Sequence, residues 1–68
     1  MTQDDLVWAH LAEHGSITQL EATALYGITR LAAIIHKLRH KYGAKIQTVT
    51  VTDVNRYGRP VRYARYYL

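Results

Sequence analysis

The sequence contains no cysteine and no phenylalanine, and it has no long apolar run. Without cysteine, neither a disulfide nor a thiolate metal site can stabilise the fold. No apolar stretch approaches the roughly 20 residues that a helix needs to cross a bilayer. A phosphate-binding glycine loop is also absent, and no nucleophile lies at a suggestive spacing from a base. We therefore expect a small cytoplasmic domain that has no cofactor and is not an enzyme.

Positive charge is missing from the first 29 residues, because all nine Lys and Arg residues lie between Arg30 and Arg65. The formal charge is −4 over residues 1–29 and +8 over residues 30–68. A basic surface attracts a polyanion and gains affinity by releasing condensed counterions. We therefore expect a nucleic-acid partner, although charge alone also allows a solvated basic face without a ligand.

The 68 residues allow one domain, residues 1–68, with a small core. Over residues 3–14, Val7, Leu11 and His14 recur at i, i+4 and i+7, and Trp8 beside Val7 widens the apolar stripe. Acidic residues favour the start of this helix, and the glycine that follows residue 14 suits its end.

Thr18 and Glu21 form a capping box, which predicts a second helix over residues 19–26. Its apolar face should include Leu20 and Ala24. Ser16 and Ile17, just before the box, are interpreted as a short connection between the first two helices.

A third helix is predicted over residues 30–42, with Thr29 as its N-cap. Leu31, Ile35 and Leu38 recur at helical spacing, and Gly43 ends the pattern. The second and third helices are thus joined by a turn of a few residues that contains Gly27. Such a tight turn is typical of a helix-turn-helix.

Beyond the helices the apolar period changes from 3.6 to 2, which predicts strands over residues 45–53 and 61–67. Asn55, Gly58 and Pro60 between them favour a turn, so the two strands should form a hairpin. Two strands alone are marginally stable, and one face of the hairpin must therefore pack on the helices. Val49 and Val51 have the opposite parity to Ile46, which leaves open which face this is.

Three helices followed by a basic hairpin resemble the winged helix-turn-helix domains, an α+β class. Residues 14–22 look like the start of the second helix in this family, and residues 27–33 look like the turn into its recognition helix. Residues 55–59, with 62–66 after them, are similar to the wing of short stand-alone members from phage and prophage genomes. The resemblance implies that the third helix enters the major groove of DNA and that the wing lies along the backbone or minor groove.

Carried over by position, the resemblance implies a set of DNA-binding residues on these two elements. On the third helix they are Thr29, Arg30, Ala33, Ile34, Lys37 and Lys41; on the wing they are Arg56, Tyr57, Arg59 and Arg62. Arg30 is the main candidate for a bidentate contact to guanine. We expect these cationic side chains to share one side of the folded molecule.

The histidines form two pairs at i, i+4, His10 with His14 and His36 with His40. This spacing can place two imidazoles on one metal ion, but no cysteine or carboxylate cluster completes a site, and we expect no metal. The tyrosines of the second strand, Tyr63, Tyr66 and Tyr67, should pack against the third helix rather than stack on bases.

The function that these features favour is double-stranded DNA binding by a small phage-type transcriptional regulator or excision factor in a bacterial host cell. A module of this size covers few base pairs, so specific recognition favours a homodimer or tandem sites. The alternative is a winged helix that binds a protein and so inhibits or adapts a larger nucleic-acid-processing complex. Exposure of Trp8 and Ile34 would favour that alternative.

Overall fold

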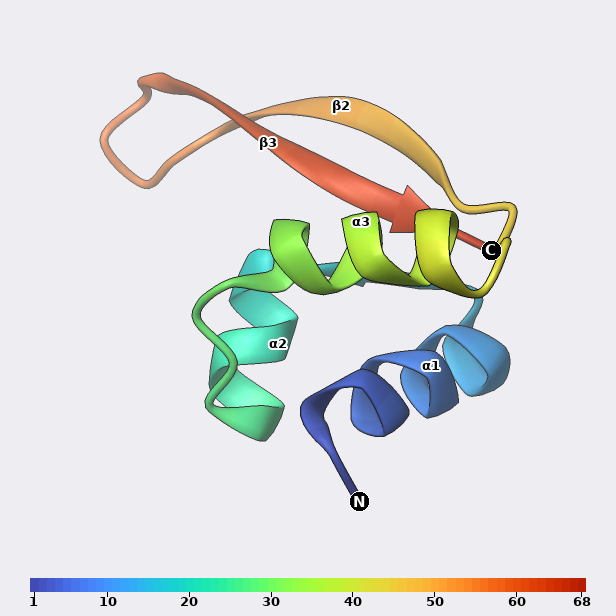
Figure 1. The fold of residues 1–68 in the computed structure, drawn as a ribbon. Helices are drawn as coiled ribbons and strands as arrows, with labels where there is room; N and C mark the ends of the chain where they lie inside the picture. Colours follow the sequence, from blue (N-terminus) through green and yellow to red (C-terminus); the bar gives the residue numbers. More distant parts are fainter.

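A computed structural model describes residues 1–68. The elements in order are α1 (Gln3–His14), β1 (Ser16–Thr18), α2 (Gln19–Tyr26), α3 (Leu31–Lys41), β2 (Gln47–Val54) and β3 (Pro60–Tyr67). The three helices pack together at one end of a curved antiparallel sheet, and the hairpin of β2 and β3 extends beyond them (Figure 1). The predicted α+β class is confirmed.

Two capping boxes start α1 and α2. At α1, the Thr2 hydroxyl accepts a hydrogen bond from the Asp5 N–H (3.2 Å), and the Asp5 carboxylate accepts one from the Thr2 N–H (3.0 Å). Thr18 and Glu21 form the same reciprocal pair at α2. Each pair satisfies two N–H groups that a helix start leaves without partners. These local signals explain why both helices start where the sequence indicates.

The sheet has three strands rather than the two expected, in the order β1-β3-β2. The additional strand, β1, is the segment that the sequence suggested was a plain connection. Ser16 pairs with Tyr67 and Thr18 with Arg65. Because β1 has only three residues, it is too short to show an alternating pattern, and its partner lies at the far end of the chain.

Ten buried apolar side chains form a single core beneath the sheet: Val7, Leu11, Ile17, Ala22, Ile28, Leu31, Ile34, Ile35, Leu38 and Ile46. Three expectations about its edge were wrong. Leu20 is 79% exposed and Ala24 is also exposed, because α2 reaches the core only through Ala22 and, in part, Tyr26. Trp8 is 44% exposed, and His10 rather than His14 is the buried histidine of α1.

The structure also shows which hairpin face packs on the helices. Ile46 and Tyr66 lie on the core side, and Thr48 opposite Tyr66 shares that face. Val49 and Val51 therefore point to the outer face, without a bulge in the register. Tyr66 packs against the core as expected, whereas Tyr63 and Tyr67 are about two-fifths exposed, at 38% and 40%.

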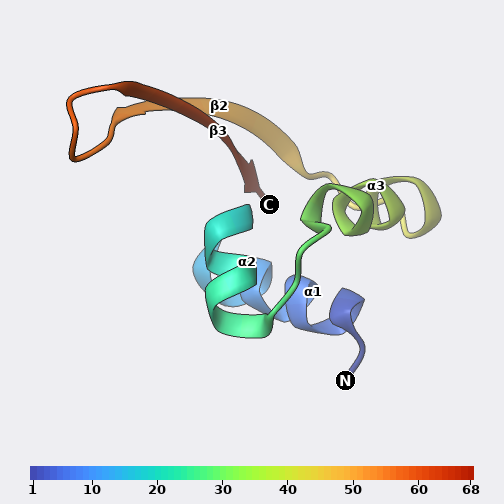
Figure 2. The ribbon, with the colours of Figure 1, turned by 90° about the vertical axis from the view of Figure 1, so that its left-hand side faces the viewer.

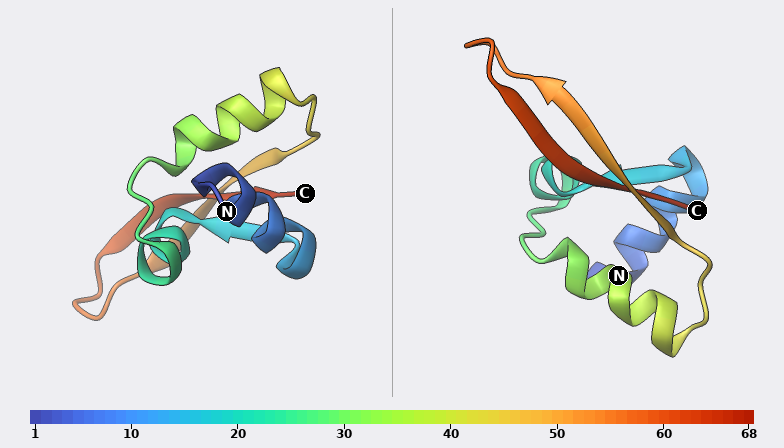
Figure 3. Two further views of the ribbon diagram at one scale, coloured as in Figure 1. Left: turned by 60° about the horizontal axis from the view of Figure 1, so that its bottom comes forward. Right: turned by 90° about the horizontal axis from the view of Figure 1, so that it is seen from above.

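The hairpin of β2 and β3 extends well beyond the helices, giving overall dimensions of 39 × 22 × 20 Å. Seen end on, its tip and α3 lie to opposite sides of α2 (Figure 2). From above, the hairpin runs diagonally to one side of α3 and projects past α2 (Figure 3). None of the three helices combines the length and apolar character that a membrane span requires.

Candidate nucleic-acid interface

The turn between α2 and α3 is held by the side chain of Gln19, at the start of α2. Its Nε2 donates to the Ile28 carbonyl (2.6 Å), and its Oε1 accepts the Leu31 N–H (3.0 Å). Thr23 donates its hydroxyl to the same Ile28 carbonyl (3.0 Å). Gln19 therefore fixes α2 against the first turn of α3. Sequence reasoning missed this role, because a single glutamine beside a capping box gives no signal of a bond twelve residues away.

Arg30, and not Thr29, is the N-cap of α3, and its own side chain makes no capping hydrogen bond. Gln19 supplies the missing acceptor instead. Both Thr29 and Arg30 are exposed. The guanidinium of Arg30 is therefore free of any local structural task. Arg30 directly precedes α3, whose first turn lies at the end of the helix away from the chain's C-terminus (Figure 1).

Ile34 is only 7% exposed and belongs to the core, so its expected place on the exposed face of α3 was wrong. Its neighbours on the helix surface explain the difference. Ile34 falls three residues after Leu31 and four before Leu38, on the buried stripe. The exposed face is formed instead by Ala32, Ala33, His36 and His40.

Lys37 and Lys41 lie one turn apart in the C-terminal half of α3, and Lys37 contacts α1. Lys37 Nζ is 3.0 Å from the Asp4 carboxylate, which offsets part of its positive charge. Lys41 lies over the ring of Tyr42, with 5.6 Å between its Nζ and the ring centroid. Of these two lysines, Lys41 is the one without a carboxylate partner.

Arg39 connects α3 to the base of the hairpin. Its Nε donates to the Ile46 carbonyl (2.8 Å) and its Nη2 to the Thr48 hydroxyl. These contacts fix the angle at which β2 leaves the helices. Arg39 is thus a structural arginine, and sequence reasoning that counted it only as positive charge missed its function in positioning the wing.

The hairpin tip is closed by Asn55. The Asn55 N–H donates to the Arg59 carbonyl (2.9 Å), while its side-chain oxygen accepts from the N–H groups of Tyr57 (2.9 Å) and Arg59 (3.1 Å). Gly58 adopts a positive φ of 75°, which favours glycine. The side chains of Arg56 and Arg59 remain exposed, and Arg56 lies 5.1 Å from the Tyr57 ring centroid.

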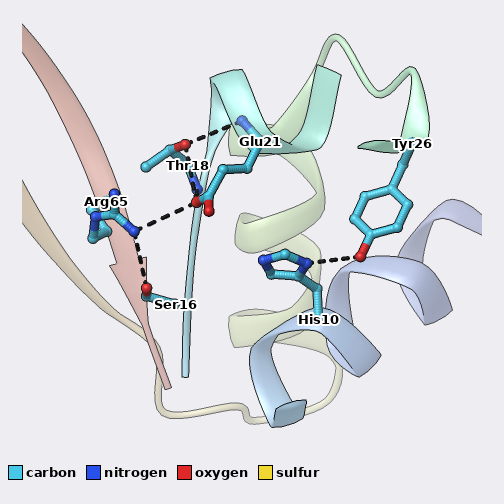
Figure 4. A network of polar contacts seen from close by, with 6 residues as sticks. All are labelled: His10, Ser16, Thr18, Glu21, Tyr26 and Arg65. Atoms are coloured by element: carbon cyan, nitrogen blue, oxygen red, sulfur yellow. Dashed lines mark hydrogen bonds and ion pairs between the residues drawn. The ribbon is translucent and has the colours of Figure 1, made fainter. Parts of the chain in front are cut away.

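The two arginines of β3 lie on opposite faces of the hairpin. Arg62 has the parity of Thr52, on the face shared with Thr48, which Arg39 of α3 contacts. Arg65 is on the outer face, where Nη1 reaches Ser16 (3.1 Å) and Glu21 (3.5 Å) (Figure 4). Arg62 is exposed and has no hydrogen-bond or ion-pair partner, whereas Arg65 belongs to the link between the sheet and α2.

The expected DNA-binding residues, apart from the buried Ile34, thus fall into three groups. Thr29, Arg30 and Ala33 lie at the N-terminal part of α3. Arg56, Tyr57, Arg59 and Arg62 lie on the wing. Lys37, which pairs with Asp4 of α1, and Lys41, one turn further along, lie in the C-terminal half of α3. The wing tip and the start of α3 lie toward the same end of the molecule (Figure 1), but the tip is displaced sideways from α3 (Figure 2). A ligand that contacts both must span the width of the domain.

The histidine pairs have different environments. His10 is buried, its Nδ1 lies 2.7 Å from the Tyr26 hydroxyl, and its Nε2 has no hydrogen-bond partner (Figure 4). The rings of His36 and His40 lie 4.2 Å apart in the middle of the exposed face of α3. Neither pair belongs to a group of three or more potential metal ligands.

Two helices that meet in a tight turn, followed by an exposed arginine-tipped hairpin, define a helix-turn-helix domain with a wing. A family model described as a winged helix-turn-helix domain matches residues 2–68, and the chain belongs to this family. A search of curated proteins gave no match. Winged helix-turn-helix domains are typically DNA-binding modules without enzymatic activity, so membership indicates DNA binding in general.

Proposed function

We propose that this protein binds double-stranded DNA, with the exposed face of α3 in the major groove and the wing on the backbone or the adjacent minor groove. Its cellular role is that of a small phage-type transcriptional regulator or excision factor in the host cytoplasm. Phosphate contacts supply most of the affinity in this proposal, as is usual for a basic module.

The observation that supports the proposal is the set of arginines without ion-pair partners at the two ends of the interface. Arg30 at the start of α3 and Arg56 and Arg59 at the wing tip are all exposed. The two carboxylate pairs of Lys and Arg residues involve Lys37 and Arg65 instead. Arginines that are free of internal partners keep their full capacity to hold phosphates or guanine.

Base contacts in this arrangement come from the first turn of α3. Thr29, Arg30 and Ala33 are exposed there, and Arg30 can reach the O6 and N7 atoms of guanine through two N–H groups. Lys37 and Lys41 meet phosphates along the flank of the helix. Arg56, Arg59 and Arg62, with Tyr57, follow the backbone or insert toward a narrow minor groove. Ile34 takes no part, because it is buried.

The test is fluorescence anisotropy with a labelled duplex, measured between about 50 and 200 mM salt. Arg30→Ala and Arg56→Ala should each weaken binding and lower the slope of log K against log salt by about one. Lys45→Ala is the matched control: it removes one exposed charge from the loop between α3 and β2, far from the wing tip. Equal losses of DNA affinity in all three variants would mean that the protein attracts DNA only through its overall charge, which would contradict the proposed interface.

The same titration with single-stranded DNA and double-stranded RNA of equal length decides which nucleic acid is bound. The proposal expects the DNA duplex to bind tightest, since the RNA major groove is too deep and narrow to admit a helix. Absence of duplex binding even at about 50 mM salt would overturn the proposal.

A second candidate function is binding of a protein partner within a nucleic-acid-processing complex. It is supported by the half-exposed Trp8, which lines a hollow of about 550 Å³ between α1 and α3 together with Asp4, Asp5 and Tyr42. Trp8→Ala distinguishes the two functions. If the protein acts by binding DNA, Trp8→Ala should leave its DNA affinity unchanged. If it acts by binding a protein partner, Trp8→Ala should abolish its activity in cells.

A further inference from the structure

β2 lies at the edge of the sheet, and one side of its main chain has no strand beside it. The hydrogen bond from the Asn55 N–H to the Arg59 carbonyl shows which residues of β2 direct their main-chain N–H and C=O groups toward β3 and which direct them away from it. Residues that form main-chain hydrogen bonds to the partner strand alternate with residues that do not, so residues 47, 49, 51 and 53 are the ones that hydrogen-bond to β3. Thr48, Thr50 and Thr52 therefore point their N–H and C=O groups away from the sheet. Pro60, which has no N–H, stands opposite Val54 at a position that this alternation leaves without a bond.

Nothing in the sequence protects this edge. Proteins usually blunt an open edge strand with a lysine, a proline, a bulge or a covering segment. The stretch from Gln47 to Thr52 contains no charge, proline or glycine, and its register is unbroken. Only its base is covered, where Arg39 occupies the Ile46 carbonyl and the Thr48 hydroxyl. The open part thus runs along the main chain from Thr48 to Thr52.

This open stretch reads the same in both directions. Residues 48–52 are Thr-Val-Thr-Val-Thr, with Thr50 at the centre. A two-fold dimer needs a surface that is complementary to itself, so that residue i meets residue j and j meets i. If two such strands pair antiparallel about Thr50, Thr48 faces Thr52 of the second copy. The outward N–H groups of each strand then lie opposite the outward C=O groups of the other, so that they can form hydrogen bonds.

The side chains of this stretch are also arranged symmetrically about Thr50. On the outer face, Val51 lies opposite Tyr63 of β3, with Val49 and Val61 beside this pair, and Tyr63 also borders a hollow that it shares with residues at the start of α2. Val49, Val61 and Tyr63 are 44%, 36% and 38% exposed. Pairing about Thr50 places Val49 opposite Val51 of the second copy. Two half-exposed apolar patches would then join into one across the axis.

Charge favours this edge over the other surfaces for contact between two copies. The chain carries a net charge of +4, and its positive side chains lie on α3, on the loop before β2, at the hairpin tip and on β3, so two copies that met through these parts would repel each other. The segment from Gln47 to Thr52 adds no charge of its own. It is the stretch of the basic half of the chain where two copies approach with the least repulsion.

We propose that the β2 edge is a homodimer interface, in which a second copy pairs antiparallel about Thr50 and extends the sheet across a two-fold axis. Its use in reading two DNA half-sites rests on the proposed function, whereas the pairing itself needs no DNA. The pairing uses the open edge of β2 in both copies, so the assembly closes at two chains.

The chain has no cysteine, so a single introduced thiol reports the register directly. Bonded residues that face each other lie about 5.5 Å apart between Cα atoms, within the range that a disulfide accepts. Thr50→Cys should therefore cross-link to its own copy under mild oxidation. Thr52→Cys is the matched control: it should not cross-link alone but should do so when mixed with Thr48→Cys. Comparable self-cross-linking of Thr52→Cys and Thr50→Cys would overturn the register.

Sedimentation velocity of the full chain without DNA measures the assembly itself. The wild type should show a monomer–dimer equilibrium that depends on concentration. Thr50→Pro should remain a folded monomer, because its lost N–H points away from β3 and proline is tolerated there. Thr50→Ser, which keeps the N–H, should still dimerise. A wild type that stays monomeric up to about millimolar concentration, or larger aggregates without a dimer, would refute the interface.

The experiments can refute the homodimer interface and the proposed DNA binding independently of each other. If only the interface is wrong, Thr50→Pro binds a two-half-site duplex as the wild type does. If only DNA binding is wrong, the dimer and its cross-link persist while no duplex is bound. If both hold, Thr50→Pro should retain binding to a single half-site and lose at least tenfold in affinity on the double site.

Discussion

Arg65 of β3 and Glu21 of α2 are joined through a carboxylate oxygen that also caps α2. Glu21 Oε1 lies 3.5 Å from Arg65 Nη1 and accepts the Thr18 N–H at 2.9 Å (Figure 4). One carboxylate therefore holds the start of α2 and also ties it to the end of the chain. This oxygen connects the helix-turn-helix to the sheet that carries the wing.

Loss of Glu21 should cost more than loss of Arg65. Glu21→Ala removes the cap as well as the ion pair, and we expect a loss of about 1 kcal/mol or more in the free energy of unfolding. Arg65→Ala should cost less, because the pair is about one-third exposed and screened by solvent. Urea denaturation of both single variants and the double variant measures the coupling. A coupling energy near zero would mean that the ion pair adds nothing beyond the cap.

Arg39→Ala should weaken DNA binding without removing a DNA contact. Its hydrogen bonds to Ile46 and Thr48 fix the base of β2, so their loss frees the wing and costs about 1.5–3 kcal/mol of stability at most. Hydrogen exchange should rise along β2 and β3 in this variant. Lys41→Ala, on the same helix, removes the same charge and should leave exchange in the hairpin unchanged. If exchange is unaffected in both, Arg39 does not position the wing.

The sequence predicted those parts of the fold that have local signals. Acidic residues at the start of α1, the capping box of α2, helix-ending glycines and the change of period mark α1, α2 and the hairpin within a few neighbouring residues. The features that were missed depend on partners far along the chain. β1 becomes a strand only because β3 pairs with it, and Gln19 acts only through a turn formed later. Ile34 was placed by family position, although its own spacing from Leu31 and Leu38 puts it on the buried stripe.

Asp5 should make stability depend on pH at the acid end. The Thr2 backbone N–H, and then its hydroxyl, hold the pKa of Asp5 below the ordinary 3.8. A carboxyl whose pKa is lowered on folding stabilises the protein above its unfolded pKa. That contribution is lost as pH falls through the folded value. The stability difference between wild type and Asp5→Asn should therefore be constant above about pH 5 and shrink below 3.8, as followed by urea denaturation; a difference independent of pH would contradict this.

Ile34 and Ala33 are adjacent in sequence but should respond to substitution in opposite ways. Ile34→Ala leaves a cavity between α3 and the rest of the core, and we expect it to cost about 3 kcal/mol of stability. Once its lower stability is allowed for, the affinity of its folded fraction for DNA should stay close to wild type. Ala33→Glu changes an exposed position and should leave stability within about 0.5 kcal/mol. Its carboxylate would meet the DNA backbone, so its affinity should fall at least tenfold. Measuring both urea unfolding and anisotropy separates the two effects. If Ala33→Glu binds as tightly as the wild type, this face of α3 does not enter the groove.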